Sequence, residues 1–243
     1  MAVSYPRAIV AALAAAGAGL APTAASAGVV VAASGPSATS FPIGKKIGDG
    51  ESIVLRTGDT LTVLDDRGTR VLRGAGSFSL GQQTGPSQRG LFAVLTERRS
   101  ARWMHIGGVR AIRSVEEEDR NLWYVDVARP GNVCIYSDEE VALSRASADG
   151  NATYIISNDA GRNWEVTFFN SETLAWWDTS ALPVTEGTVY RISGPEGTQL
   201  GDFRFTVLDA AAQDPEGLAE KLIEHGCWQQ LELLSTATLI AER

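Results

Sequence analysis

Four short apolar runs between residues 53 and 80, separated by turns rich in glycine and aspartate, most constrain what this chain can fold into. The runs cover residues 53–55, 61–64, 71–72 and 78–80, and the breaks cover residues 57–59, 65–68 and 74–76. Apolar and polar residues roughly alternate in these runs, as they do in strands with one buried face. The stretch therefore predicts a β-meander, which forms part of a small β unit over residues 28–81.

Residues 1–27 carry the three parts of a secretory signal peptide. Arg7 supplies a positive charge, residues 8–21 an apolar stretch, and Ala25, Ser26 and Ala27 a small-residue cleavage site. The alternative is an uncleaved membrane anchor, although this stretch of about 14 residues is shorter than the roughly 20 of a spanning helix. We expect cleavage before Gly28 and a periplasmic or secreted protein, and the alanine-rich leader is typical of bacteria.

The chain is acidic, with a formal net charge of −8 over 243 residues. Such a chain has no general electrostatic attraction to nucleic acid or to anionic lipid. After residue 27 no stretch is long and apolar enough to cross a bilayer. We therefore expect no nucleic-acid partner and, after cleavage of the leader, no integral membrane span.

The chain has two cysteines, Cys134 and Cys227. In an oxidising compartment they most simply form one disulfide, which closes a long loop and stabilises the fold by about 4 kcal/mol. The alternative is a free thiol in a cysteine-dependent hydrolase, which needs a base within reach. His105 and His225 are the two histidines. His225 lies two residues from Cys227, so on a helix their side chains point apart.

Residues 82–121 form a helical and charged linker. A helix is expected from Ser87 to Glu97 or Arg99, with Leu91, Val94 and Leu95 on one face. A cluster of basic residues follows it: Arg98, Arg99, Arg102, Arg110 and Arg113. This cluster is either a strip that contacts an anion or a protein partner, or a solvated connector neutralised by the acidic residues 116–119.

Residues 122–208 return to short β-rich runs at intervals of roughly 8–12 residues, which predicts an antiparallel β-sandwich. Residues 209–243 form a helical tail. Asp214 is its N-cap, Pro215 takes the first helical position, and Gly226 ends the first helix. The second helix has Trp228, Leu231 and Leu234 on one face. We expect the apolar faces of both tail helices to be buried on the sandwich. The predicted fold class is thus mainly β, with short C-terminal helices.

The first β unit resembles the FecR-like periplasmic β domain. The resemblance rests on Gly58-Asp59-Thr60-Leu61, on the hairpin Val63-Leu64-Asp65-Asp66-Arg67-Gly68, and on Gly74-Ala75-Gly76-Ser77-Phe78. It covers about 50 residues, and it departs from the family pattern at Arg67 and at a missing second Thr-Gly loop. The resemblance implies a non-enzymatic envelope module that acts in signalling or protein contact. It also implies an envelope protein as partner, with a caspase-like CHAT-domain protein as one candidate.

Catalytic and metal-binding motifs are absent from the sequence: it has no C-x-x-C, H-E-x-x-H, EF-hand loop or G-x-S-x-G. We therefore expect no cofactor and no metal. Trp176 and Trp177 are neighbours on a strand, so one ring is expected in the core and the other outside. The outer ring either packs at the edge of the sheet against the C-terminal helices or contacts a sugar or a protein partner. The leading hypothesis is a non-catalytic scaffold or interaction protein. The alternatives are a carbohydrate-binding envelope module that uses the exposed Trp and, least favoured, the cysteine-dependent hydrolase.

Overall fold

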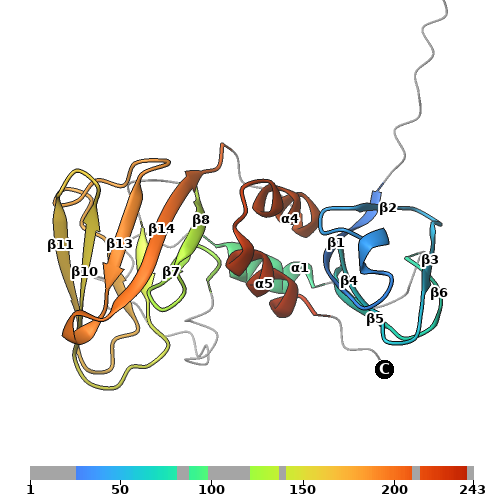
Figure 1. Ribbon diagram of the computed structural model, residues 1–243, viewed down its shortest axis with the longest axis horizontal. Helices are drawn as coiled ribbons and strands as arrows, with labels where there is room; N and C mark the ends of the chain where they lie inside the picture. The colour runs from blue at the N-terminus through green and yellow to red at the C-terminus, as the bar shows by residue number, and fades with distance from the viewer. Residues whose placement is uncertain (1–25, 81–87, 98–120, 137–140, 210–213, 240–243) are drawn as a thin grey trace, which may run out of the picture.

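The computed structural model describes residues 26–80, 88–97, 121–136, 141–209 and 214–239. Over these residues the protein is mainly β, as predicted, with several antiparallel and mixed sheets. Figure 1 shows two β units at opposite ends of the molecule, with the helices between them. The predicted leader falls almost entirely outside the described residues.

The N-terminal unit consists of two sheets that enclose a core. The first is antiparallel with the order β2-β1-β4-β5, and the second pairs β3 with β6. The elements are β1 (Ser26–Ser34), the 3-10 helix η1 (Ala38–Ser40), β2 (Lys46–Gly48), β3 (Ser52–Leu55), β4 (Thr60–Asp65), β5 (Gly68–Arg73) and β6 (Gly76–Ser79). Alternate residues of β3 and β4, including Ile53, Leu61 and Val63, point into the shared core. The predicted one-sided burial is therefore present.

The strand pairing is not a simple meander, and this corrects the prediction. Of the four strands between residues 52 and 79, only β4 and β5 form a hairpin, whereas β3 pairs with β6; β1 lies between β2 and β4. The chain changes sheets at Asp59. The carboxylate of Asp59 accepts the backbone N–H of Arg56 at 2.5 Å and that of Ser37 at 2.9 Å, and its carbonyl accepts the N–H of Gly74 at 2.9 Å. Hydrogen bonds of the Asp59 side chain and backbone thus hold the chain at this corner.

The second unit is a sandwich of a five-stranded sheet, β11-β10-β13-β14-β8, and a three-stranded sheet, β12-β9-β7. The elements are β7 (Tyr124–Asp126), β8 (Gly131–Ile135), β9 (Ala142–Ser144), β10 (Ala152–Asn158), β11 (Asn163–Phe168), β12 (Leu174–Trp176), β13 (Val189–Ser193), the 3-10 helix η2 (Pro195–Gly197) and β14 (Gln199–Val207). One core joins the two sheets. The sandwich is mostly antiparallel, but β8 runs parallel to β14 and β7 runs parallel to β9.

Three helices of the described chain pack between the β units: α1 (Arg89–Thr96), α4 (Pro215–Glu224) and α5 (Trp228–Ala237). A shared core unites their apolar faces with residues of β1, β4 and β8. The sequence predicts a tail packed on the sandwich. In the structure the tail packs on both units, because α4 contacts β1 and β4 while α5 contacts β8, β1 and β5. In α1 the buried residues are Phe92 and Leu95, whereas Leu91 is exposed.

Local helix signals are confirmed in the tail. Asp214 Oδ1 accepts the N–H of Gly217 at 2.7 Å, Pro215 is the first residue of α4, and Gly226 has a φ of 67° after the helix ends. The disulfide is also confirmed: Cys134 of β8 is bonded to Cys227 at the start of α5, with 5.9 Å between their Cα atoms. Both cysteines are fully buried.

The segment after α5 closes the edge of the N-terminal sheet. The backbone N–H of Thr69 in β5 donates to the carbonyl of Thr238 at 2.8 Å, and the two threonine hydroxyls are 3.0 Å apart. Leu239 continues this contact as a parallel bridge to Thr69. An open strand edge is thus covered by the same chain. In the described part of the protein, no helix has the length and apolar character needed to cross a membrane.

Candidate functional site

The best-defined exposed feature of the sandwich is a pair of loops joined by the buried side chain of Arg145. This residue follows β9 and is only 7% exposed. Its guanidinium donates to the carbonyl of Glu172 at 2.7 Å and to the carbonyls of Phe169 and Gly150, each at 2.9 Å. It also lies over the ring of Phe168, 5.4 Å from the centroid. A rigid planar donor with several acceptors fixes the loops on both sides of it.

The two loops are further bonded to each other. The N–H of Ser171 donates to the carbonyl of Ala148 at 2.8 Å, and the amides of Asn170 and Asn151 accept the N–H groups of Gly150 and Asn170 at 3.0 and 2.9 Å. Ser171 has a φ of 73°, which a non-glycine residue adopts at a cost. The surrounding bonds hold it there.

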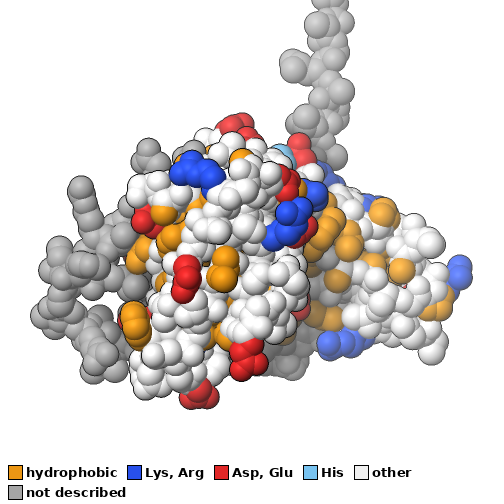
Figure 2. All heavy atoms as spheres, turned by 60° about the vertical axis from the view of Figure 1, so that its left-hand side comes forward, with side chains coloured by type: hydrophobic (Ala, Val, Ile, Leu, Met, Phe, Trp, Pro, Cys, Tyr) orange, Lys and Arg blue, Asp and Glu red, His pale blue; other side chains and the backbone are white. Residues whose placement is uncertain are grey.

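Phe169 is presented by this framework and is 58% exposed. It follows β11, its N–H donates to the carboxylate of Glu172 at 3.0 Å, and its carbonyl is held by Arg145. Figure 2, in which the sandwich comes forward, shows hydrophobic side chains scattered among polar and charged ones rather than one broad apolar area. A partner at this end of the molecule would therefore depend on individual anchoring side chains. Aromatic anchors held in place before binding contribute strongly to interfaces.

Trp176 is the last residue of β12 and Trp177 follows it, and their side chains lie on opposite sides of the three-stranded sheet. Trp177 is 4% exposed, donates from Nε1 to the carbonyl of Leu182 at 2.7 Å, and packs against Trp164, Tyr190 and Phe205. Trp177 is thus the core member of the pair. Trp176 is partly buried, and its Nε1 is buried without a hydrogen-bond partner. Neither ring offers a broad open face to a sugar.

Among the tryptophans that the structure describes, Trp228 is the exposed one, at 52%. The sequence places it on the buried face of the second tail helix, together with Leu231 and Leu234. Those two leucines are buried, but Trp228 is the first residue of α5 and projects from its end. Helical periodicity defines a face within a helix, but it does not show whether the first turn reaches the core.

A cavity of about 190 Å³ lies between α5 and the strands β7, β8 and β9. Its walls combine apolar side chains with polar ones. The polar lining residues are Asn121, Tyr124, Asp126, Arg129, Asn132, Ser144, Gln229 and Gln230. No residue of this set was singled out from the sequence, because the cavity forms only where segments about 100 residues apart meet.

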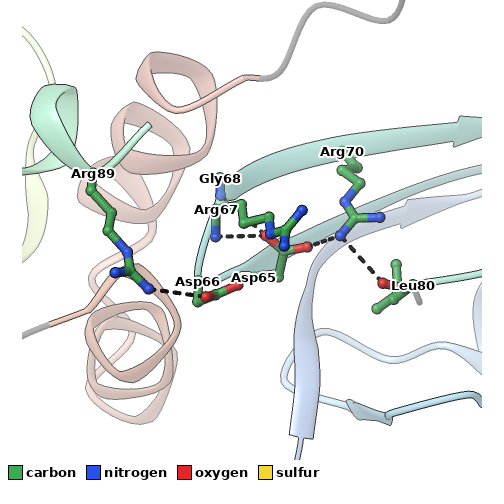
Figure 3. A network of polar contacts seen from close by, with 7 residues as sticks. All are labelled: Asp65, Asp66, Arg67, Gly68, Arg70, Leu80 and Arg89. Atoms are coloured by element: carbon green, nitrogen blue, oxygen red, sulfur yellow. Dashed lines mark hydrogen bonds and ion pairs between the residues drawn. The ribbon is translucent and has the colours of Figure 1, made fainter. Parts of the chain in front are cut away.

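The charged turn between β4 and β5, where Arg67 departs from the FecR-like pattern, has a structural role (Figure 3). Asp65 is buried, accepts the N–H of Arg67 at 2.8 Å and that of Gly68 at 3.1 Å, and forms an ion pair with Arg70. The turn also docks α1, because the carbonyl of Arg67 accepts the N–H of Gln88 at 2.8 Å. The carboxylate of Asp65 is thus bonded to groups of the same turn and of β5.

Two groups of predicted residues remain. Arg98, Arg99 and Arg102 lie outside the described residues, as does His105. Cys134 and Cys227 are joined in the disulfide, so a thiol nucleophile at either position requires its reduction. In the residues that the structure describes, no group of three or more His, Cys, Asp or Glu side chains is arranged to hold a metal ion.

Comparisons of this chain with protein-family models, with curated proteins and with solved structures return no match.

Proposed function

We propose that this chain is an exported, non-catalytic envelope protein that acts as a scaffold or protein-interaction module in the periplasm or outside the cell. The observation that carries the proposal is Phe169, an exposed aromatic ring on loops fixed by the buried Arg145. A loop that is ordered before binding loses little entropy when a partner covers it. Burial of such a ring against a protein is the usual source of a binding hot spot.

The disulfide and the leader support the compartment. Disulfides persist in oxidising compartments outside the cytoplasm, and Cys134–Cys227 joins β8 of the sandwich to the start of α5. The leader pattern of residues 1–27 agrees with export. The partner we propose is another envelope protein with an apolar recess that accepts one aromatic side chain.

The test is photo-crosslinking in the producing cells, with benzoylphenylalanine in place of Phe169 in the full chain. We expect one adduct of defined mass at this position. The matched control places the same group at Val54, which is 63% exposed on β3 of the other unit. Equal adducts at both positions, or none at position 169, would refute the proposal.

A second variant separates the role of the ring from that of the loop framework. Arg145→Met in the crosslinking chain keeps the benzoylphenylalanine at position 169 but removes the guanidinium that holds the backbone carbonyl of that position. We expect the yield of the adduct to fall at least threefold while the disulfide still forms. An unchanged yield would show that the fixed geometry is not needed.

A further inference from the structure

The cavity between α5 and the sandwich is bounded by side chains that are already fixed by the fold. Gln229 Nε2 donates to the carbonyl of Pro130 at 2.6 Å, Asp126 Oδ1 accepts the N–H of Ala128 at 2.9 Å, and Asn132 Nδ2 donates to the carbonyl of His225 at 3.3 Å. Each bond uses one polar atom of its side chain. The polar walls are therefore oriented before anything binds.

The remaining polar atoms of these side chains are mostly acceptors. Within the described part of the chain, Asp126 Oδ2, Asn132 Oδ1, Gln229 Oε1 and the Ser144 hydroxyl take part in no hydrogen bond. Ser144 is the direct neighbour of Asp126 across the parallel pair of β7 and β9. A cavity rich in acceptors favours a ligand with several hydroxyl or amine donors.

The carboxylate of Asp126 in the cavity lining disfavours an anionic ligand beside it. Arg129, which also lines the cavity, forms an exposed ion pair with Glu232, whereas Asp126 forms no ion pair with any described residue. An anionic ligand would leave the Asp126 carboxylate beside another negative charge at a cost. A neutral or positively charged ligand meets no such cost.

We propose that this cavity binds a small hydroxyl-rich ligand of the sugar class, neutral or carrying an amine. Its volume corresponds to about six waters at about 30 Å³ each, which is below the roughly 300–1,000 Å³ of pockets for drug-sized ligands. A compact polyol of one ring matches this size. The proposal is independent of the Phe169 surface, because the two lie on different elements.

Trp228 lies near one lining residue of the cavity, Asn132. A Cβ atom at Gly226 would be 3.2 Å from Asn132 Nδ2 and 3.6 Å from Trp228 Nε1, so the cavity-lining amide and the indole border the same glycine. The indole has an exposed apolar face and a polar edge, and such a ring can contact the C–H face of a sugar whose hydroxyls enter the cavity. This assigns the ring-stacking role to Trp228 instead of Trp176 or Trp177.

The test is titration of the full, disulfide-bonded chain with D-glucose, D-galactose, D-mannose and D-glucosamine, followed by saturation-transfer NMR and calorimetry. D-Glucose 6-phosphate serves as the anionic probe. We expect saturable binding of at least one of the first four and at least tenfold weaker binding of the phosphate. No saturable binding of any of the four, or preferred binding of the phosphate, would overturn the proposal.

Three variants tie binding to the cavity. Asp126→Asn is expected to weaken binding at least tenfold. Gln229→Ala and Trp228→Ala are each expected to weaken it about threefold. Asp202→Asn removes one carboxylate from an exposed position on β14 and is expected to leave affinity unchanged. If Asp126→Asn and Asp202→Asn have the same effect, the binding site is elsewhere. A thermal melt of each variant shows that the fold is retained.

Discussion

The side chain of Gln230 exchanges two hydrogen bonds with the backbone of Cys134. The N–H of Cys134 donates to Gln230 Oε1 at 2.7 Å, and Gln230 Nε2 donates to the carbonyl of Cys134 at 2.8 Å. Nε2 donates also to the carbonyl of Leu122 at 2.9 Å. The amide thus takes the place of a neighbouring strand at the edge of β8. It does so one helical turn from the disulfide that joins the same residue, Cys134, to α5.

Gln230→Leu is predicted to lower the free energy of unfolding by about 3 kcal/mol. The change leaves up to three buried backbone groups without a partner, each at a cost of about 1–3 kcal/mol when no water replaces it. Urea denaturation at neutral pH measures the loss. Gln229→Leu on the same helix is the control, because Gln229 is less buried and makes one such bond, to the carbonyl of Pro130. Equal losses in the two variants would contradict the role assigned to Gln230.

Arg145→Met is predicted to cost about 2 kcal/mol and to loosen the two loops that present Phe169. The aliphatic stem is kept, but the loop carbonyls that accept from the guanidinium lose their shared donor. Denaturant melts give the energy, and hydrogen exchange at the Ser171 and Gly150 amides reports the loops. Arg191→Met removes an exposed ion pair with Asp159 and should cost less than about 1 kcal/mol. Unaltered exchange in Arg145→Met would show that the loops hold themselves.

Acid should erase the difference between the wild type and Asp59→Asn. Hydrogen bonding by the Ser37 side chain, the backbone N–H groups of Ser37 and Arg56, and the nearby Arg56 charge lower the pKa of Asp59, although burial opposes them. A carboxyl with a lowered folded-state pKa adds stability above its unfolded value of about 3.9 and loses it as the pH falls through the folded value.

Urea midpoints from pH 7 to pH 2 check this prediction. The wild type should be the more stable protein at pH 7, and the gap should narrow below about pH 4. Asp202→Asn, at an exposed position, controls for the loss of one carboxylate and should shift the midpoint little at neutral pH. A gap for Asp59→Asn that stays constant down to pH 2 would rule out the ionised carboxylate as its source.

The disulfide should resist reductant in the folded protein and react only after unfolding, because both of its cysteines are fully buried. Replacing both cysteines by alanine is predicted to lower the free energy of unfolding by about 4 kcal/mol, given the 93-residue separation. Thiol labelling with and without guanidinium measures access, and denaturation of the double variant measures energy. Rapid labelling of the folded protein by a reductant-coupled probe would show that α5 opens away from β8.

Local signals in the sequence predicted local structure. Asp214 and Pro215 specify the start of α4 because the cap and the first-turn geometry depend only on adjacent residues. The Cys134–Cys227 bond was predicted because the chain has just two cysteines and its leader pattern predicts an oxidising compartment. The β-rich class followed from the spacing of apolar runs and turns.

The sequence did not predict the long-range contacts of the fold. The pairing of β3 with β6 depends on the Asp59 corner, whose partner Ser37 is 22 residues away. Arg145 gave no signal, because its acceptors are backbone carbonyls, and any residue can supply a carbonyl. The cavity and the exposure of Trp228 arise where α5 meets the sandwich, and no local pattern encodes that meeting.

Residues 227–239 cover two strand edges, so the protein cannot finish folding before these residues are present. The edge of β8 is covered only once Gln230 is present, 96 positions after Cys134, and that of β5 only once Thr238 is present, 169 positions after Thr69. A polypeptide emerging from the ribosome thus carries two uncovered strands that are able to pair with other chains. It also lacks the disulfide that joins β8 to α5. The protein is therefore completed late in its synthesis. A chain shortened by a few dozen residues would keep two uncovered strand edges and lack the disulfide, so it would be prone to aggregate rather than fold into a slightly smaller protein.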